Sequence, residues 1–169
     1  MMPHTGIFGP TQCGKTTLGK SLCTDWERRK WSCLVLDPLG SKWPCTWQTE
    51  DAEDFIAKAK QAKNCKLFVD EAGLTINRER AMQWLFVTAR HWGHQTFVLG
   101  HAGGQLLPVM RQQIGVLYLF RTHPDEVDMW QHQFIGSDLS RAAQLQQYEF
   151  LKVEQFAPVR GPLKLNLAV

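Results

Sequence analysis

The chain has 169 residues, enough for one α/β domain with a good core and too few for a second domain of similar size. Its 44% hydrophobic and 21% charged residues describe an ordinary globular protein, and the net charge of +3 does not by itself argue for a nucleic-acid partner. Five cysteines without a C-x-x-C pair and the lack of a long apolar run exclude a disulfide scaffold, a zinc knuckle and a transmembrane segment. We expect a soluble, intracellular protein with no signal peptide.

The first motif is the segment 9–16, GPTQCGKT, which fits the pattern G-x-x-x-x-G-K-[ST] at every fixed position. In this pattern, glycines let successive backbone N–H groups point inward and surround the β- and γ-phosphates of a nucleotide. Lys15 would reach the terminal phosphates, and the hydroxyl of Thr16 would bind Mg²⁺. The sequence therefore predicts a site for ATP and Mg²⁺. The residues expected to contact the nucleotide are Gly9, Pro10, Thr11, Gln12, Cys13, Gly14, Lys15, Thr16 and Thr17.

The segments on either side of this motif match the context that it needs, a strand before the loop and a helix after it. Residues 4–8 form a short strand candidate. Leu18, Leu22 and Trp26 recur every four residues among polar residues, which is typical of an amphipathic helix. A helix that begins at the loop would direct its positive N-terminal end at the phosphates.

The rest of the chain alternates between predicted strands and predicted helices. The expected strands are 32–37, 66–70, 95–100 and 115–120, the expected helices are 50–63, 77–91, 105–113, 125–134 and 140–147, and 38–48 is an expected loop. This alternation predicts βαβ units and a mainly parallel sheet. From Tyr148 onward the sequence alternates in places and carries prolines, which indicates an edge hairpin. We expect a single domain over 1–169, with its core at about 4–135 and a C-terminal helix and hairpin at about 136–169.

A pair of acids, Asp70 and Glu71, ends the apolar strand predicted at 66–70. Parallel strands present their C-terminal ends at one edge of a sheet, where ligands bind, so this pair would face the phosphate loop. There Asp70 would hold Mg²⁺ together with Thr16, and Glu71 would orient and deprotonate a water aimed at the γ-phosphate. Because a hydrolase needs such a second carboxylate, the pattern predicts hydrolysis of ATP.

Three further polar residues flank the strand predicted at 95–100. Arg90 precedes it, His101 follows it directly, and Arg111 lies in the short helix after it. Phosphoryl transfer needs cations on the developing negative charge and a polar group that senses the γ-phosphate. Since the three residues cluster around one strand next to the expected nucleotide edge, we expect them to act in catalysis together with Lys15 and Glu71.

Five stretches of the chain resemble the HerA–FtsK class of RecA-like motors, and within it the viral genome-packaging ATPases. The stretches are GPTQCGKTTL, VLDPLGS, LFVDEAG, ARHWGHQTFVLGHAGGQLLPVMRQQ and VLYLFR. The first and third are common to many NTPases. The fourth is more specific, because it combines an arginine before a strand, a polar residue at the end of that strand, and Leu-Pro followed by an arginine. The resemblance covers about residues 7–134.

The resemblance implies a three-layer RecA-like P-loop NTPase fold in which the strand 95–100 lies between the phosphate-loop strand and the acidic-pair strand. His101 would then lie between Lys15 and Asp70, where a sensor belongs. The family usually has glutamine at the position of His101, and the charge of a histidine there would depend on pH. The resemblance also implies a ring in which an arginine of one subunit completes the site of its neighbour, with Arg90 as the first choice and Arg111 as the second.

The partners that the resemblance implies are DNA, held by its backbone, further copies of the chain in a pentameric or hexameric ring, and the proteins of a capsid vertex. The expected locations are the host cytoplasm and the packaging vertex of the virion. Arg78 and Arg80 follow the acidic pair, and in ring motors this region can face the central channel, so we consider them candidates for tracking DNA. On this interpretation the protein is an ATP-hydrolysing motor that packages a viral genome into a preformed capsid.

Two alternatives to a motor remain open on the sequence. The segments GPTQCGKTT and VDEAG also resemble thymidine kinase, in which the carboxylate activates a hydroxyl group instead of water. The paired cysteines of that family's zinc site are absent, and no base-binding lid is evident. The second alternative is an assembly or switch protein that binds nucleotide and hydrolyses it negligibly. Nucleotide products formed from nucleosides would identify the kinase, and an unchanged Glu71→Gln variant would identify the switch.

Overall fold

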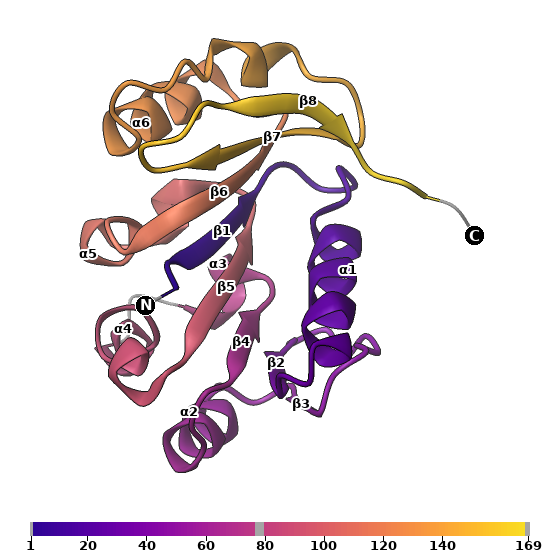
Figure 1. The fold of residues 1–169 in the computed structure, drawn as a ribbon, viewed down its shortest axis with the longest axis vertical. Helices are drawn as coiled ribbons and strands as arrows, with labels where there is room; N and C mark the ends of the chain where they lie inside the picture. Colours follow the sequence, from indigo (N-terminus) through magenta and orange to yellow (C-terminus); the bar gives the residue numbers. More distant parts are fainter. Residues whose placement is uncertain (1, 77–79, 168–169) are drawn as a thin grey trace.

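The structure, a computed structural model, describes residues 2–76 and 80–167, and the strands of this part of the chain form one mixed sheet (Figure 1). The strand order is β3-β2-β4-β5-β1-β6-β7-β8. β1 to β6 are parallel to one another, and β7 and β8 pair antiparallel at one edge. The strands are β1 His4–Phe8, β2 Cys33–Leu36, β3 Trp47–Thr49, β4 Lys66–Val69, β5 Gln95–Gly100, β6 Ile114–Phe120, β7 Glu149–Glu154 and β8 Arg160–Lys164.

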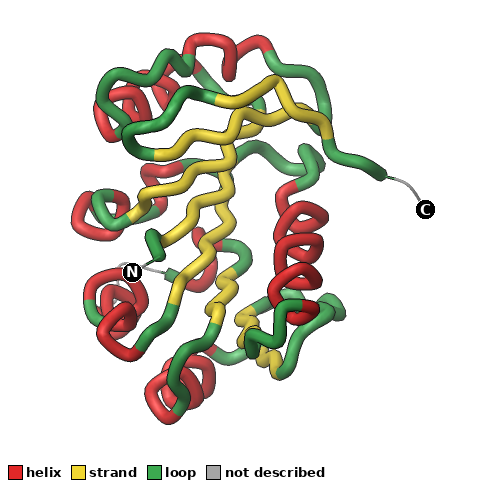
Figure 2. Tube along the Cα trace, in the orientation of Figure 1, coloured by secondary structure: helices red, strands yellow, loops and turns green. Residues whose placement is uncertain are grey.

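Helices cover both faces of this sheet (Figures 1 and 2). The α-helices are α1 Lys15–Arg28, α2 Ala52–Gln61, α3 Ala72–Thr75, α4 Arg80–Val87, α5 Pro108–Arg111 and α6 Pro124–Gln133, and the 3₁₀ helices are η1 Ala89–Trp92, η2 Gly103–Gln105 and η3 Ser140–Gln144. One apolar core lies between the sheet and α1, around Leu18 and Cys23. The other core lies on the opposite face, where α2, α4 and α6 contribute Phe55, Leu85 and Trp130. None of the described helices is long and apolar enough to span a membrane.

The predicted strand order at the centre of the sheet is confirmed, because β5 lies between β1 and β4. The C-terminal ends of these three strands therefore meet at one edge of the sheet. They lead into the phosphate loop, His101 and the acidic pair, respectively. The three-layer α/β architecture and the C-terminal β-hairpin are also confirmed.

Helix α2 shows how local sequence determines where a helix begins and which face it buries. Its N-cap is Asp51, whose carboxylate accepts a hydrogen bond of 2.8 Å from the backbone N–H of Asp54. The acids Glu53 and Asp54 lie in the first turn and two lysines lie in the last, as the helix dipole favours. Phe55 and Ile56 are buried against the sheet. The helix is shorter than the predicted segment 50–63 because Ala62 already has an extended backbone conformation.

Several predicted boundaries were wrong. The segment 38–48, predicted as a loop, leads into the short edge strand β3, which the alternation rule missed because three half-buried residues show no period. The predicted helix 77–91 is divided into α4 and the 3₁₀ helix η1, and residues 77–79 lie outside the described part of the chain. The predicted helix 105–113 narrows to α5, because Pro108 fixes its first turn. The segment 140–147 forms only η3.

Two buried histidines join the strands to the helices. His4 Nδ1 accepts a hydrogen bond of 2.9 Å from the backbone N–H of Thr96, so Nε2 carries the proton and donates to Phe86 O at 2.9 Å. His94 has the same arrangement, accepting from Cys65 N and pairing with Ala59 O. Burial is the main cause that lowers the pKa of His4 from 6.5 to about 4, since protonation would charge a group shielded from water and remove its acceptor nitrogen. Both rings are therefore neutral at physiological pH.

We predict that His4 makes stability depend on pH. Since the pKa of His4 is lower in the folded state, the unfolded chain binds the additional proton between about pH 6.5 and 4, and stability falls as the pH falls through this window. The shift corresponds to about 2 kcal/mol of unfolding free energy lost between pH 7 and pH 5. Urea denaturation at the two pH values should show this loss in the native chain, and a smaller loss in His4→Gln. The exposed His132→Gln is the matched control, and an equal loss in His4→Gln and the native chain would contradict the prediction.

Candidate functional site

The phosphate loop connects β1 to α1 and is held by the neighbouring strand. The backbone N–H of Gly9 donates to Gly100 O at 3.2 Å, which ties the start of the loop to the end of β5. Gly14 has φ of 107° and precedes the first turn of α1. This left-handed conformation favours glycine, and a Cβ here would also displace the end of the Leu165 side chain. The loop thus turns sharply into the N-terminus of α1, where free backbone N–H groups favour an anion.

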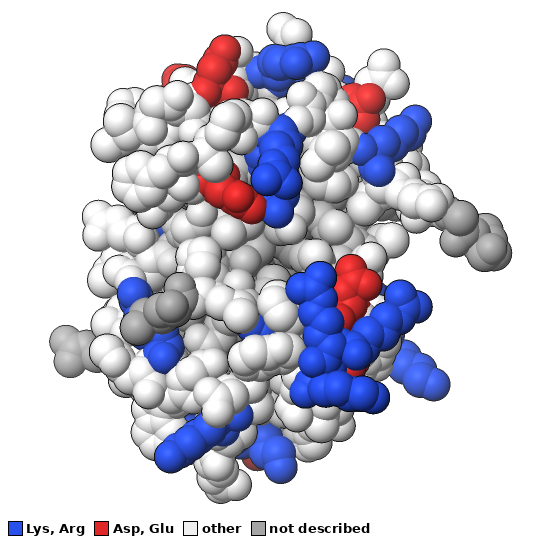
Figure 3. All heavy atoms as spheres, in the orientation of Figure 1, with Lys and Arg blue, Asp and Glu red and all other residues white. Residues whose placement is uncertain are grey.

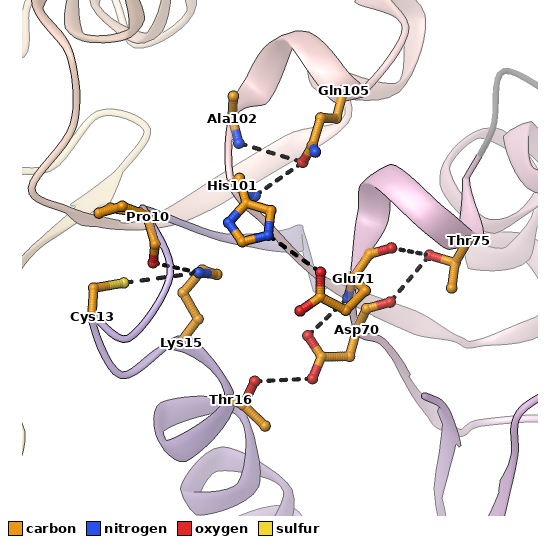
Figure 4. A network of polar contacts seen from close by, with 10 residues as sticks. All are labelled: Pro10, Cys13, Lys15, Thr16, Asp70, Glu71, Thr75, His101, Ala102 and Gln105. Atoms are coloured by element: carbon orange, nitrogen blue, oxygen red, sulfur yellow. Dashed lines mark hydrogen bonds and ion pairs between the residues drawn. The ribbon is translucent and has the colours of Figure 1, made fainter. Parts of the chain in front are cut away.

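Lys15 is buried and lies against the loop that precedes it (Figure 4). Its Nζ donates to Pro10 O at 2.7 Å and lies 4.0 Å from the Cys13 sulfur. Figure 4 shows this amine on the side of the loop that faces Glu71 and His101. A carbonyl oxygen is a weaker partner for an ammonium group than a phosphate oxygen, so a bound phosphate would compete for this amine.

Thr16 joins the phosphate loop to the acidic strand. Its hydroxyl donates to Asp70 Oδ2 at 3.0 Å, and Asp70 Oδ1 accepts from the backbone N–H of Glu71 at 2.8 Å. Burial raises the pKa of the Asp70 carboxyl, the two hydrogen bonds act in the opposite direction, and the carboxylates of Asp37 and Glu71 add to the rise. The buried Asp70 carboxylate thus lies beside the Thr16 hydroxyl and forms no ion pair with a described residue.

This donor set fits Mg²⁺. Carboxylate and hydroxyl oxygens are hard ligands of the kind Mg²⁺ prefers, and a divalent cation next to Asp70 would offset the cost of its burial. Mg²⁺ usually keeps several waters and binds to one or two protein oxygens together with nucleotide phosphates. Thr16 and Asp70 are the two side chains that would hold it.

Glu71 has an unusual backbone conformation at the end of the acidic strand. Its φ of 51° lies in the left-handed region, which is uncommon for residues other than glycine. The following helix α3 fixes this conformation, because the Thr75 hydroxyl lies 3.0 Å from Glu71 O and 3.1 Å from Asp70 O. The Glu71 carboxylate lies on the side that faces Lys15 and His101 (Figure 4).

His101 is the nearest side-chain partner of that carboxylate. Its Nε2 lies 3.3 Å from Glu71 Oε2, and both side chains are partly exposed. The structure thus brings Lys15, Thr16, Asp70, Glu71 and His101 together at one edge of the sheet (Figure 4). A water molecule between the phosphate loop and Glu71 would have a base on one side and cations on the other.

The loop that carries His101 is braced by residues that sequence reasoning missed. Gln105 Oε1 accepts from the backbone N–H of His101 at 2.9 Å, and Glu126 Oε2 accepts from Gly103 N at 2.7 Å. Leu165, from the tail after β8, makes an apolar contact with the phosphate loop at Gly14. The contacts of Glu126 and Leu165 are distant in sequence and follow no motif. Only the glutamine four residues after His101 gives a local signal.

The predicted arginines do not join this site within one chain. Arg90 precedes β5 and so lies at the edge of the sheet opposite the phosphate loop, where it donates a weak bond of 3.4 Å to Phe86 O. Arg111 instead stabilises the His101 loop, since its guanidinium donates to Gly103 O at 3.1 Å and to Leu106 O at 2.8 Å. The expected cluster of both arginines around the nucleotide edge is therefore not formed. Arg78 and the side chain of Arg80 lie outside the described residues.

A cavity of about 600 Å³ opens beside the phosphate loop. It is lined on one side by Pro10, Thr11 and His101, and on the other by Arg121 and His123, which follow β6. Arg121 is exposed and was not among the predicted site residues. Space for a ligand thus adjoins the residues gathered at this edge.

Comparison with solved structures identifies the fold. The genome packaging NTPase B204 from Sulfolobus turreted icosahedral virus 2 in complex with AMPPCP matches with a TM-score of 0.72 and 19% identity, over 95% of this chain and 98% of that one. B204, the DNA-packaging ATPase from Sulfolobus turreted icosahedral virus, matches with a TM-score of 0.73, 18% identity and the same coverage. The cytoplasmic domain of the type VII secretion ATPase EccC from Thermomonospora curvata matches with a TM-score of 0.68 and 15% identity, over 94% of this chain and 23% of that one.

The sequence matches no protein-family model and no curated protein. At identities below 20%, the structural matches establish the fold and leave the activity to be argued from the site. The chain has the fold of RecA-like P-loop ATPases, and the likeness to genome-packaging ATPases expected from the motifs is confirmed at this level.

Proposed function

We propose that the protein is an ATP-hydrolysing motor that moves DNA, and that it packages a viral genome into a preformed capsid. The observation that carries the hydrolytic part is the bond of 3.0 Å between the Thr16 hydroxyl and Asp70, with Glu71 directly beside it. This contact joins a phosphate-binding loop to a carboxylate pair, which is the arrangement that phosphoryl transfer to water requires.

In this proposal the backbone N–H groups of residues 9–16 and the amine of Lys15 bind the phosphates, and Thr16 and Asp70 hold Mg²⁺. The cation, when bound, would neutralise charge on the β- and γ-phosphates. Glu71 accepts a proton from the attacking water as the bond from water oxygen to the γ-phosphorus forms and the bond to the ADP oxygen breaks. His101, at 3.3 Å from Glu71, orients that carboxylate and senses the γ-phosphate.

The DNA-moving part of the proposal is supported by the likeness to two proteins described as a genome packaging NTPase and a DNA-packaging ATPase. We infer contacts to the DNA backbone without base recognition, because translocation must work on any sequence. The partners would be other copies in a pentameric or hexameric ring and the proteins of a capsid vertex. The expected locations remain the host cytoplasm and the virion.

The proposal also assigns an arginine that acts on the neighbouring subunit's nucleotide. Arg90 is the better candidate, because the Arg111 guanidinium already donates two hydrogen bonds to backbone carbonyls. Arg90 Nε is buried with no partner among the described residues, and Arg90 lies at the far edge of the sheet from its own phosphate loop. A ring that sets this edge against a neighbour's phosphate loop would bring the terminal nitrogens of Arg90 toward that neighbour's nucleotide.

Glu71→Gln tests the hydrolytic role. The amide has nearly the same shape but accepts a proton poorly, so phosphate release from ATP should fall by about 10² to 10⁴-fold. Binding of ATP should persist, because the phosphate loop is unchanged, and can be followed with a fluorescent ATP analogue. The matched control is Glu50→Gln, an exposed residue outside the site, which should keep full turnover.

Full turnover in Glu71→Gln would contradict the role of Glu71 in the motor. Negligible turnover in the native chain, unchanged in Glu71→Gln, would favour a nucleotide switch. Turnover that appears only with an added nucleoside, with a phosphorylated nucleoside as product, would instead favour a kinase. The same assay with DNA completes the comparison, since phosphate release by a motor should be stimulated by DNA.

Mixing variants tests whether Arg90 acts between subunits. We expect Arg90→Ala and Glu71→Gln to be inactive separately. A mixture should recover activity at the interfaces where an intact Arg90 from one subunit meets an intact Glu71 from the other. Phosphate release above the sum of the two separate variants would show this recovery. Arg111→Ala is the comparison variant and should chiefly lower the melting temperature, because it removes the two bonds that hold the His101 loop. A mixture of exchanging subunits that stays inactive would refute the role in trans.

A further inference from the structure

A second cavity lies at the edge of the sheet opposite the phosphate loop. Its volume is about 780 Å³. It opens where β4 and β5 begin, whereas the phosphate loop follows the end of the parallel strand β1. We call it the basal pocket and define it by Trp31, Lys63, Lys66, Arg90, His91 and Gln95, all of which line it. It shares none of its lining residues with the proposed hydrolytic site apart from Arg90, which that proposal assigns to the neighbour's nucleotide.

The basal pocket carries positive charge without a balancing acid. Lys63, Lys66 and Arg90 line it, together with His91, and no aspartate or glutamate is among the described lining residues. In the described part of the chain, none of these three cations takes part in an ion pair. A cavity of this kind attracts anions, because its walls exclude water and leave the cationic charges poorly screened.

Lys66 is the most deeply placed of these cations. Its residue is only 1% exposed, and its Nζ lies 3.8 Å and 4.0 Å from the ring centroids of Trp26 and Trp31. The amine donates to Gln95 Oε1 at 2.8 Å, and its other close contact is the Met2 sulfur at 3.0 Å. Burial and the nearby Arg29 lower the pKa of Lys66 to about 8, so the amine is still mainly charged at neutral pH. A thioether is a weak acceptor, and an anion in the pocket would replace it with a strong one.

Arg90 supplies a second donor that lacks an acceptor. Its Nε is buried and makes no hydrogen bond among the described residues, and the single bond from its terminal nitrogen, to Phe86 O, is long at 3.4 Å. Native structures rarely leave a buried donor unpaired, and such a group often marks the place of an ion or ligand. Lys66 and Arg90 both line this cavity, and each could donate a further hydrogen bond to a bound anion.

Basic residues also lie on the surface next to the basal pocket, where they are interspersed with the acids Asp25 and Glu154. Figure 3 shows Lys and Arg side chains gathered over α1, whose C-terminal end carries Arg28 and Arg29. Arg29 lies 5.1 Å from the ring centroid of Trp26, and a second hollow, lined by both residues, shares Gln95 with the basal pocket. In a nucleotide, the phosphate could contact such cations while the base stacks on a neighbouring aromatic ring.

We propose that the basal pocket is a second phosphate-binding site, which takes a phosphate group of a nucleotide unit between Lys66 and Arg90 with its base beside Trp31. The phosphate belongs either to a DNA strand or to a free nucleotide. This site goes beyond the proposed hydrolysis of ATP, since it lies at the other edge of the sheet and does not need the phosphate loop.

The test is a titration of the full chain with inorganic phosphate, in a Lys15→Ala background that weakens the phosphate loop. Binding is followed by NMR through the Nε–H signal of Arg90 and the indole N–H signal of Trp31. We expect saturable shifts of both signals. Lys66→Met should weaken binding about tenfold, because it removes a charge-assisted hydrogen bond while an apolar chain of similar length keeps the packing between the rings. Lys60→Gln, a lysine of α2 outside the pocket, is the matched control and should bind like its parent.

A double variant, Lys63→Gln with His91→Ala, keeps the test decisive if Lys66→Met fails to fold, because both residues are exposed. It should also weaken phosphate binding. Shifts that do not saturate, equal affinity in the parent and the pocket variants, or acetate that binds as well as phosphate would each overturn the proposal. The titration measures phosphate binding and not ATP hydrolysis. A negative result would therefore not contradict the proposed function, and a loss of hydrolysis would not contradict the phosphate site.

Two further ligands distinguish the sources of the phosphate. A short oligothymidylate that binds more tightly than thymidine monophosphate, with an affinity that falls steeply as salt rises, would support the site and identify DNA. Equal affinity for both would support the site and identify the free nucleotide. If neither moves the Arg90 and Trp31 signals, the proposal is wrong.

Discussion

The hydrogen bond between Thr16 and Asp70 is the contact on which the site depends. It connects the first turn of α1 to the end of β4 across the intervening strand β5, so it fixes the distance between the phosphate loop and the acidic pair. Its acceptor is a carboxylate that is only 4% exposed, and burying such a group is costly unless it is paired. This costly burial occurs at the edge of the sheet where β1, β4 and β5 end, next to the phosphate loop, the acidic pair and His101.

The two edges of the sheet have different electrostatic roles. At the C-terminal edge, the carboxylates of Asp70 and Glu71 face the amine of Lys15 and the ring of His101, so anionic and cationic groups surround a space suited to Mg²⁺ and triphosphate. At the N-terminal edge, Lys66 lies beside Trp26 and Trp31, and no aspartate or glutamate is among the described residues that line the basal pocket. Both edges keep charged groups in buried positions, which a structural role alone would not favour.

Sequence reasoning gave the fold and the centre of the site because both rest on local signals. The glycine pattern of residues 9–16, the apolar run before Asp70 and the alternation of elements each have a direct physical meaning, and the strand order was implied by the family resemblance. The 3₁₀ helices and the strand β3 were missed because they depend on packing rather than on period. The sequence did not show that Arg90 lies at the edge of the sheet opposite the phosphate loop, because adjacency to a strand does not specify which end of the strand faces the ligand. The basal pocket had no sequence signal, since Lys66 opens a strand like any solvated lysine.

The most direct test of the account is a crystal structure of the protein with Mg²⁺ and AMPPCP. We expect the triphosphate within the loop of residues 9–16, the cation bound to the Thr16 hydroxyl with Asp70 beside it, and Glu71 facing a water in line with the γ-phosphorus. A nucleotide bound elsewhere, or a cation remote from Asp70, would contradict it.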